Sequence, residues 1–176
     1  MTASTGDVII AKYEIAAPIS QGSMFDVFLA YHIQFSWPAA IKILQSQYLH
    51  DEELVEHVYE QLKVASQQVH PNIVLTYDVG FTDSGRPYAA MALVEGISLS
   101  KKLDRWRQGQ GQIPDKDALH LGLGIAEGLA TLQRAGITHT NLNPEHIIIQ
   151  RDNSPVIIGL GDPAPLGSKN AIIYEL

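Results

Sequence analysis

The sequence has 176 residues, of which 45% are hydrophobic and 18% charged, and its formal net charge is -7. This composition is typical of a folded globular chain and excludes a disordered one. The negative charge disfavours nucleic acid as a ligand, because a phosphate backbone requires a basic protein surface. There is no cysteine, which excludes disulfides, thiolate metal sites and cysteine catalysis. No apolar run approaches the roughly 20 residues of a membrane span, so we expect a cytoplasmic protein with no direct membrane insertion in this segment.

The first part of the chain has the pattern of an antiparallel sheet. Its first eight or so residues, rich in Thr, Ser and Gly, are expected to be a loose terminus. From about Val8 to Leu44, short apolar runs alternate with turn residues. Strands are predicted at 13–15, 27–31 and 39–44, with a polar turn at Ser20–Ser23.

The segment from Asp51 to Gln68 changes to a helical spacing of apolar residues, and its acidic start suits the first turn of a helix. After His70-Pro71 the strand pattern returns. The runs 74–80 and 88–94 flank a polar loop at 82–87, which predicts a hairpin.

The second half of the chain is predicted to be mainly helical. Gly96 is expected to act as a hinge, followed by helices over 99–108 and from Pro114 to about Ala135, with a Gln/Gly loop between them. The apolar runs 147–149 and 156–158 predict a second small hairpin. A sheet with one inserted helix, then a hinge, then a helical part predicts a two-lobed α+β fold.

Several segments in fixed order resemble the Hanks-type protein kinases, especially the bacterial Ser/Thr branch. The matching segments correspond to the glycine-rich loop, the strand with the nucleotide lysine, the entry to the fourth strand, the gatekeeper strand with its hinge, the catalytic loop and the metal-binding loop. In that order they are Ile19–Ala30, Ala40–Leu44, His70–Gly80, Pro87–Leu99, Gly136–His146 and Val156–Asp162.

The resemblance implies a protein-kinase-like N-lobe, an antiparallel sheet plus one helix, over 13–95, after a loose N-terminus at 1–12. It implies a reduced, mainly helical C-lobe over 96–176, with a hinge, two helices, a small hairpin and a tail. Only the fourteen residues 163–176 follow Asp162, and they contain no Ala-Pro-Glu motif. We therefore expect a truncated C-lobe.

The resemblance also assigns weak candidates for nucleotide contact. These are Gly22 in the glycine-rich loop, Lys42, and Met91 and Leu93 near the hinge. Phe25 stands where the family has a glycine, and either crowds the phosphates or is simply packed behind a β-turn. The helix position that would hold Lys42 with a carboxylate is Gln61, although Glu56 or Glu60 could substitute if the helix rotates. Lys42 is then either a nucleotide ligand or a strand lysine whose stem packs at the cleft edge.

The catalytic parts of the family pattern are altered. Asn141 stands at the position of the catalytic aspartate, and His146 replaces the asparagine that binds a metal ion. Leu160-Gly161-Asp162 is aligned with Asp-Phe-Gly, so that Leu160 replaces the Mg²⁺ carboxylate. Asp162 would reach the cleft only in a rearranged loop, and a turn at Asp162-Pro163 is the simpler interpretation. We expect no catalytic residues, no metal site and no enzyme, that is, a pseudokinase.

Three functions follow as hypotheses. The first is a protein-protein interaction scaffold or allosteric regulator in a bacterial signalling or assembly system. Its partner would be another protein or a second copy of itself, bound through the apolar helix near Leu119–Leu132. The second is a metal-independent nucleotide sensor, with no cofactor other than ATP held without metal. The third is an enzyme with rewired chemistry using Lys42, His139, His146 and Asp162.

Overall fold

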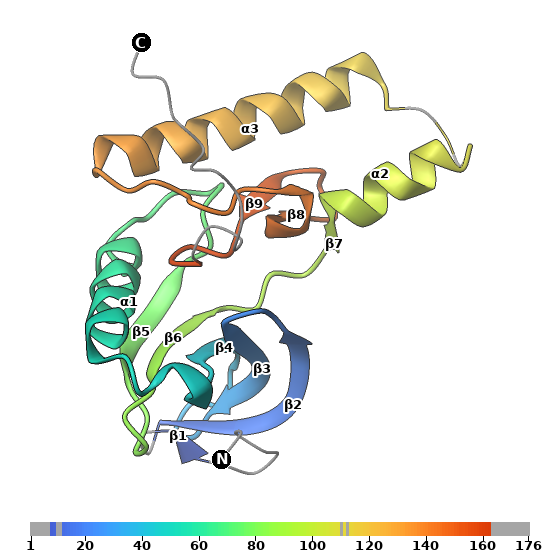
Figure 1. Cartoon of the computed structure of the whole chain (residues 1–176). Coiled ribbons are helices and arrows are strands. Elements are labelled where there is room, and N and C mark those ends of the chain that lie inside the picture. Colours follow the sequence, from blue (N-terminus) through green and yellow to red (C-terminus); the bar gives the residue numbers. More distant parts are fainter. Residues whose placement is uncertain (1–7, 10–11, 110, 112, 163–176) are drawn as a thin grey trace.

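The computed structural model of the chain describes residues 8–9, 12–109, 111 and 113–162. Two lobes are stacked in Figure 1, with a large sheet and one helix in the lower lobe and two helices and a small sheet in the upper lobe. This arrangement confirms the predicted kinase-like α+β fold.

The lower lobe contains a six-stranded antiparallel sheet in the order β1-β2-β3-β4-β6-β5. Each predicted strand is present, and a short extra strand, β1, pairs with β2 inside the segment that was predicted to be loose. The strands are β1 (Val8–Ile9), β2 (Tyr13–Gln21), β3 (Phe25–His32), β4 (Pro38–Leu44), β5 (Thr76–Phe81) and β6 (Pro87–Ala92).

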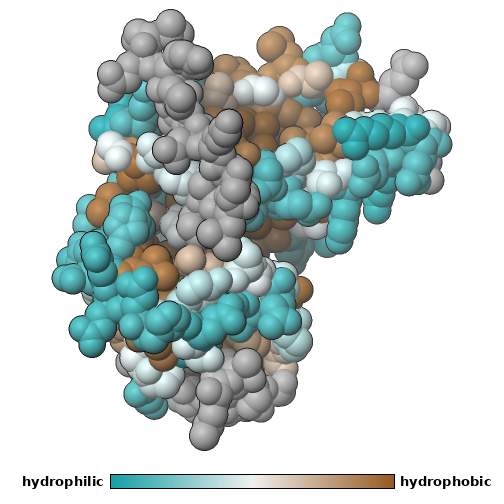
Figure 2. All heavy atoms as spheres, in the orientation of Figure 1, coloured by the Kyte–Doolittle hydropathy of each residue, from teal (hydrophilic) through white to brown (hydrophobic). Residues whose placement is uncertain are grey.

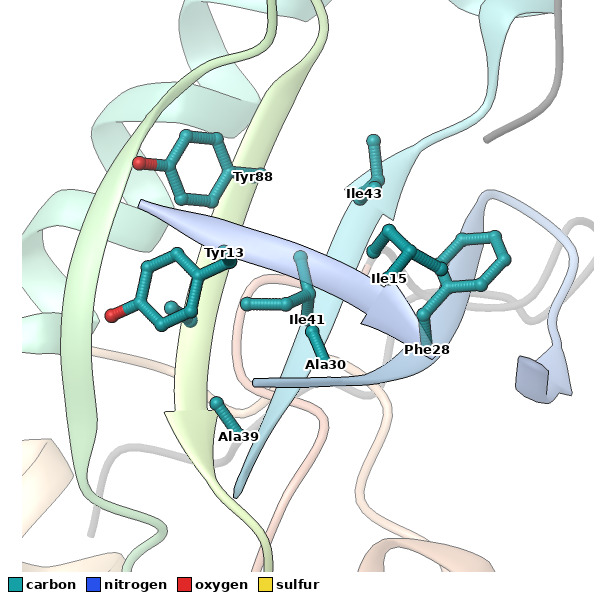
Figure 3. Close-up of a cluster of buried hydrophobic side chains, with 9 residues drawn as sticks. Tyr13, Ile15, Phe28, Ala30, Ala39, Ile41, Ile43 and Tyr88 are labelled. Atoms are coloured by element: carbon teal, nitrogen blue, oxygen red, sulfur yellow. The ribbon is translucent and has the colours of Figure 1, made fainter. Parts of the chain in front are cut away.

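Strand β4 shows why the sheet has two different faces. Successive side chains of a strand point to opposite sides. Ile41 and Ile43 are fully buried in one core cluster, which Figure 3 shows together with Tyr13, Phe28 and other side chains of the same face. Lys42 and Leu44 therefore point to the other face, where the helix α1 packs. This alternation aims Lys42 toward the second lobe.

Helix α1 (Glu52–Ser66) covers that second face of the sheet and packs against β5 and β6 (Figure 1). Its N-cap is Asp51, whose side chain accepts a hydrogen bond from the backbone N–H of Leu54 at 3.0 Å. Val58 and Leu62 of α1 are buried against Phe25, Leu44 and Ala89 of the sheet. A 3₁₀ turn, η1 (Ser46–Tyr48), precedes the helix.

The upper lobe contains the two predicted helices and the predicted hairpin. Its three-stranded antiparallel sheet has the order β7-β8-β9, and a 3₁₀ turn, η2, leads into β8. The elements are β7 (Ile97–Ser98), α2 (Leu99–Arg107), α3 (Asp115–Arg134), η2 (Pro144–His146), β8 (Ile147–Ile149) and β9 (Pro155–Ile157).

A second connection, besides the chain at Gly96, joins the two lobes. Ile73, in the segment that follows α1, forms a bridge with Ile157 of β9, and Val74 N–H donates to the Ile157 carbonyl at 2.9 Å. The buried Asn72 side chain donates to the Pro155 carbonyl at 2.7 Å. These contacts fix the position of the upper lobe relative to the lower one.

Helix α3 is buried on one side only. Leu121, Gly124, Gly128 and Leu132 face the lobe interior, whereas Leu119 is 74% exposed. Figure 2 shows apolar residues gathered at the top of the view, over α3. No helix in the described residues is both long enough and apolar enough to cross a membrane.

Candidate functional site

A cleft of about 630 Å³ lies between the two lobes. The sheet of the lower lobe, the connection between the lobes and the loops before and after the upper hairpin all contribute to its lining. All four predicted nucleotide contacts are in this lining, together with residues of the catalytic and metal-binding loops: Gly22, Lys42, Met91, Leu93, Asn141, Asn143, His146 and Asp162.

Lys42 is the buried cation of the cleft, with only 3% of its surface exposed. Its Nζ lies 2.5 Å from Asp162 Oδ1 and donates to the carbonyl of Leu160 at 2.8 Å. Burial lowers the pKa of Lys42, and the Asp162 carboxylate opposes that shift. Lys42 therefore pairs with Asp162 and not with Glu56 or Glu60, which the sequence left open as substitutes for Gln61. The partner comes from the second lobe instead of from the helix position Gln61.

Phe25 is packed, as in the simpler of its two sequence interpretations. It is 4% exposed and packs against Leu44 and α1. Its ring centroid lies 4.1 Å from Lys42 Nζ, a cation–π contact. Phe25 therefore packs against α1 and also lines the cleft, where Lys42 contacts both its ring and Asp162.

The metal-binding loop lies one residue earlier than predicted. Leu160 is 5% exposed and belongs to a core cluster with Ala65 of α1 and Leu132 of α3. In kinases the middle residue of Asp-Phe-Gly is apolar, and its packing sets the active or inactive state. Leu160 thus takes the place of the Phe, and the motif is Gly159-Leu160-Gly161. The alignment that put Leu160 at the metal-binding carboxylate is corrected.

Asp162 returns to the space that a side chain at position 159 would use. Gly159 and Gly161 both have positive φ, at 81° and 78°, and Asp162 N–H donates to the Gly159 carbonyl at 3.1 Å. A Cβ at Gly159 would lie 3.0 Å from Asp162 Oδ2. The carboxylate missing from the first motif position is thus supplied from three residues further along the chain. The observed turn spans Gly159 to Asp162 and directs the Asp162 side chain into the cleft. This is the rearranged loop that the sequence made the less simple interpretation, and the expected turn at Asp162-Pro163 lies partly outside the described residues.

The catalytic loop is held by its own side chains. Asn143 Nδ2 donates to the carbonyl and to the Oδ1 of Asn141, at 3.0 and 3.1 Å. His139 Nε2 lies 2.8 Å from the carbonyl of Ile158, consistent with the predicted structural role. Thr140 Oγ1 donates to the carbonyl of Asp162. These bonds tie the catalytic loop to the loop that carries Asp162.

The chain that forms this cleft matches a known domain family. The sequence profile described as "Protein kinase domain" matches residues 13–170. The chain belongs to the protein kinase domain family.

Among the relatives of this kinase domain are bacterial Ser/Thr protein kinases. It is 30% identical over 159 residues to the serine/threonine-protein kinase pkn3 of Myxococcus xanthus, covering 89% of this chain and 28% of the relative. It is 31% identical over 163 residues to PrkC of Bacillus subtilis, covering 93% of this chain and 24% of the relative. The chain thus spans about a quarter of the length of these relatives.

Solved structures support the same fold. The kinase domain of PknI from Mycobacterium tuberculosis matches with a TM-score of 0.77 and 24% identity in one structure, which covers 92% of this chain and 62% of that one. A second PknI structure gives a TM-score of 0.74 at 23% identity, covering 92% and 63%.

These relatives correct the expectation that the chain is not an enzyme. The curated proteins that match it are named as Ser/Thr protein kinases, and the match extends through the catalytic and metal-binding loops. From the sequence, the carboxylate of Asp162 was expected in the cleft only if the loop rearranged, and the structure has that rearranged loop. The signal for it was a glycine at the first motif position with an aspartate shortly after.

Proposed function

We propose that this chain is the nucleotide-binding part of a Ser/Thr protein kinase that transfers the terminal phosphoryl group of ATP to a protein hydroxyl. The observation that carries the proposal is the buried Lys42 ammonium, held at the cleft by Asp162 and the Leu160 carbonyl. A buried cation facing an open cleft is suited to an anionic ligand. The kinase relatives support the same reaction. ATP is a cytoplasmic metabolite, so the proposal includes a cytoplasmic location.

Lys42 would bind the phosphates, and its place is set by three groups of this chain: Asp162, the Leu160 carbonyl and the Phe25 ring. Gly22 would allow the phosphates close to the backbone, since a glycine presents no side chain there. Met91 and Leu93 would contact the base, at the strand end that joins the lobes. Most of the barrier to phosphoryl transfer is lowered by positioning and charge neutralisation of this kind.

Asn141 is expected to lower the rate of phosphoryl transfer, because it stands in place of the general base. An amide does not accept the proton of the substrate hydroxyl at neutral pH, and loss of general-base help typically costs about 10²–10⁴-fold in rate. Phosphoryl transfer requires little covalent help from the protein, so the expected result is a slow kinase. If nucleotide binds but no transfer occurs, the chain is instead the nucleotide sensor considered from its sequence.

The divalent cation that this chemistry uses neutralises the charge of the phosphates. Asp162 fits that group through its carboxylate, whose Oδ1 also pairs with Lys42. Among the described residues, no group of three or more His, Asp or Glu side chains is arranged as a metal site. Nucleotide phosphates and water would have to complete the coordination, as is usual for phosphate-bound Mg²⁺.

The first experiment is thermal unfolding of the chain with increasing ATP, in EDTA and then with Mg²⁺. Ligand at about 100 times its dissociation constant should add about 2.7 kcal/mol, which is a shift of several degrees for a domain of this size. Lys42→Met should remove the shift, whereas Lys101→Met, an α2 substitution at the cleft rim, should retain most of it. Transfer of labelled γ-phosphate to a Ser/Thr protein substrate is then assayed. No shift at millimolar ATP in any condition rejects nucleotide binding.

A second proposed role is self-association through α3, separate from any catalytic role. Leu119 and Leu123 are 74% and 55% exposed on this helix, and exposed apolar side chains that cluster mark protein contacts. The occupant we propose is a second copy of this chain, which would act as regulator or scaffold of the first. Light scattering of the chain and of a Leu119→Lys/Leu123→Lys variant tests it. A wild-type monomer rejects self-association, and leaves another protein as the partner to be sought.

A further inference from the structure

His146 has one ring nitrogen engaged and the other directed at Asp162. Its Nδ1 lies 2.7 Å from the carbonyl oxygen of Asn141. The Asn143 amide nitrogen lies 3.2 Å from the same Nδ1, a longer contact. A carbonyl only accepts hydrogen bonds, so at the shorter contact Nδ1 carries the proton and donates it. In the neutral ring this leaves a lone pair on Nε2. A backbone carbonyl that fixes the tautomer in this way is the usual outer-shell partner of a metal-binding histidine.

The free Nε2 faces a carboxylate oxygen that is also available. His146 Nε2 lies 3.5 Å from Asp162 Oδ2, while the other carboxylate oxygen, Oδ1, is held by Lys42. Two lone pairs that face each other repel unless a metal cation or a proton on Nε2 lies between them, and the proton would make the contact an ion pair. Ligands about 2.1 Å from a tetrahedral metal are about 3.4 Å apart, so the pair needs little movement to share one.

The backbone at Gly159 makes this pairing possible. A Cβ at that position would lie 2.8 Å from His146 Cγ and 3.0 Å from Asp162 Oδ2. A side chain there would therefore displace the imidazole, the carboxylate or both. The glycine that removes the usual carboxylate also opens the space in which a histidine and a relocated aspartate meet.

We propose that His146 Nε2 and Asp162 Oδ2 bind one divalent cation, and that the imidazole shifts the preference of the site from Mg²⁺ toward Co²⁺, Ni²⁺ and Zn²⁺. Hard Mg²⁺ prefers oxygen ligands, whereas imidazole suits the later first-row metals. The inference rests on the proposed function in one respect, since nucleotide phosphates and water supply the remaining ligands. It replaces the sequence-based expectation of no metal site.

The test is titration calorimetry of Mg²⁺ and of Co²⁺ into the chain with a saturating, non-hydrolysable ATP analogue. Free analogue is titrated separately, because it binds both metals itself. Co²⁺ is expected to bind the complex more tightly than Mg²⁺. The ratio of the two affinities should be larger for the complex than for the free analogue. His146→Asn should lower Co²⁺ affinity at least about tenfold and bring the two metals closer together. His57→Asn, an exposed histidine on α1, is the matched control and should change neither.

A spectroscopic readout reports the bond itself. Mn²⁺ bound to the complex should show electron spin echo modulation from a directly coordinated imidazole ¹⁴N. The signal should persist in His57→Asn and disappear in His146→Asn. Circular dichroism of the variant shows that it is folded, so that lost binding is not mistaken for unfolding.

The outcomes separate this inference from the proposed function. If the analogue binds while neither the metal order nor the nitrogen signal depends on His146, the metal pair is overturned and nucleotide binding stands. If the analogue binds in no condition, nucleotide binding is overturned, and Co²⁺ titrated into the chain alone decides the pair. If Co²⁺ binds the chain alone and His146→Asn abolishes that binding, the metal site at His146 and Asp162 is supported. If Co²⁺ does not bind the chain alone, the metal site is rejected.

Discussion

Asp162 Oδ1 lies 2.5 Å from Lys42 Nζ and so joins the sheet of one lobe to the metal-binding loop of the other. The lysine is 3% exposed and the aspartate side chain 17%. A buried charge requires a partner, because the cost of removing it from water is large. The pair therefore couples the closure of the cleft to the position of the cation that nucleotide phosphates would contact.

Replacing Asp162 should destabilise the chain. Asp162→Asn leaves Lys42 buried with only the Leu160 carbonyl and the Phe25 ring, and breaking a buried pair in this way costs about 3–5 kcal/mol. Removing both charges in Lys42→Met/Asp162→Asn should cost less than the single change. Urea unfolding of the wild type, the two single variants and the double variant forms the cycle that measures the coupling. Additive costs would show that the pair contributes no interaction energy.

Two glycines of α3, both within one turn, should respond in opposite directions to alanine. A Cβ at Gly124 would meet the Pro155 ring at 2.8 Å and the hydrogen-bonded Asn72 amide at 2.9 Å, whereas nothing lies within 4 Å of one at Gly122. Gly124→Ala should therefore cost about 1–3 kcal/mol through overpacking. Gly122→Ala should stabilise the chain by up to about 1 kcal/mol, because alanine is the better helix former. Equal effects in urea unfolding would contradict the close approach of α3 to β9.

The corrected register of the metal-binding loop predicts what position 160 tolerates. Leu160→Asp places an unpaired carboxylate among Ala65, Ile73 and Leu132, and should prevent folding or cost several kcal/mol. Leu160→Met keeps volume and apolarity and should cost less than about 1.5 kcal/mol. Thermal unfolding followed by circular dichroism compares them. A stable Leu160→Asp chain with gained Mg²⁺ binding would restore the original alignment.

His139 should make the stability depend on pH. Burial lowers its pKa below the usual 6.5, so in mildly acidic solution the unfolded chain takes up a proton that the folded chain resists. The free energy of unfolding should therefore fall as pH drops through about 6.5 and level off below the folded pKa. His139→Gln should lose this part of the slope, measured by urea unfolding between pH 5 and 8, a range set by the usual pKa. An unchanged slope would show that the imidazole is not resisting protonation.

Restoring the family's base should accelerate transfer. Asn141 lies in the cleft lining, and its side chain is engaged only by Asn143 among the contacts of the described residues. Asn141→Asp should raise the rate of phosphoryl transfer by about 10²–10⁴-fold with little change in nucleotide affinity, since the base acts in the transition state. Steady-state kinetics with a Ser/Thr substrate measures both parameters. A rate that does not rise would show that the loop holds the new carboxylate out of reach of the hydroxyl.

Much of the fold was predictable because local pattern and tertiary packing agree. The helix expected over 51–68 is α1 (Glu52–Ser66), and Glu52 and Glu53 lie in its first turn as expected, whereas Asp51 is its N-cap. The strand 39–44 is β4, where alternation alone places Lys42 on the face opposite Ile41 and Ile43. Strand β1 was missed, since a strand of two residues has no period to detect.

The candidate site was less predictable, and the reason is the same for each residue that was misplaced. The positions of Gly22, Lys42 and Asn141 follow from motif order, and the structure brings all three to the cleft. The carboxylate of Asp162 reaches Lys42 only because two residues with positive φ turn the backbone between Ile158 and Asp162. A one-residue shift in that loop moves a side chain from the core to the cleft. The only local sign of the correct register is the glycine at position 159 followed by Asp162, which does not by itself show where the carboxylate points.

The family, the two-lobed architecture and most residues around the nucleotide cleft could be inferred before the fold was known. These follow from the order and periodicity of short segments, which are properties of the chain alone. The burial of Leu160, the pairing of Asp162 with Lys42 and the approach of His146 to the same carboxylate became visible only in the folded chain. Those contacts join residues from different lobes and loops, and their free energy depends on burial and distance, which the folded backbone sets.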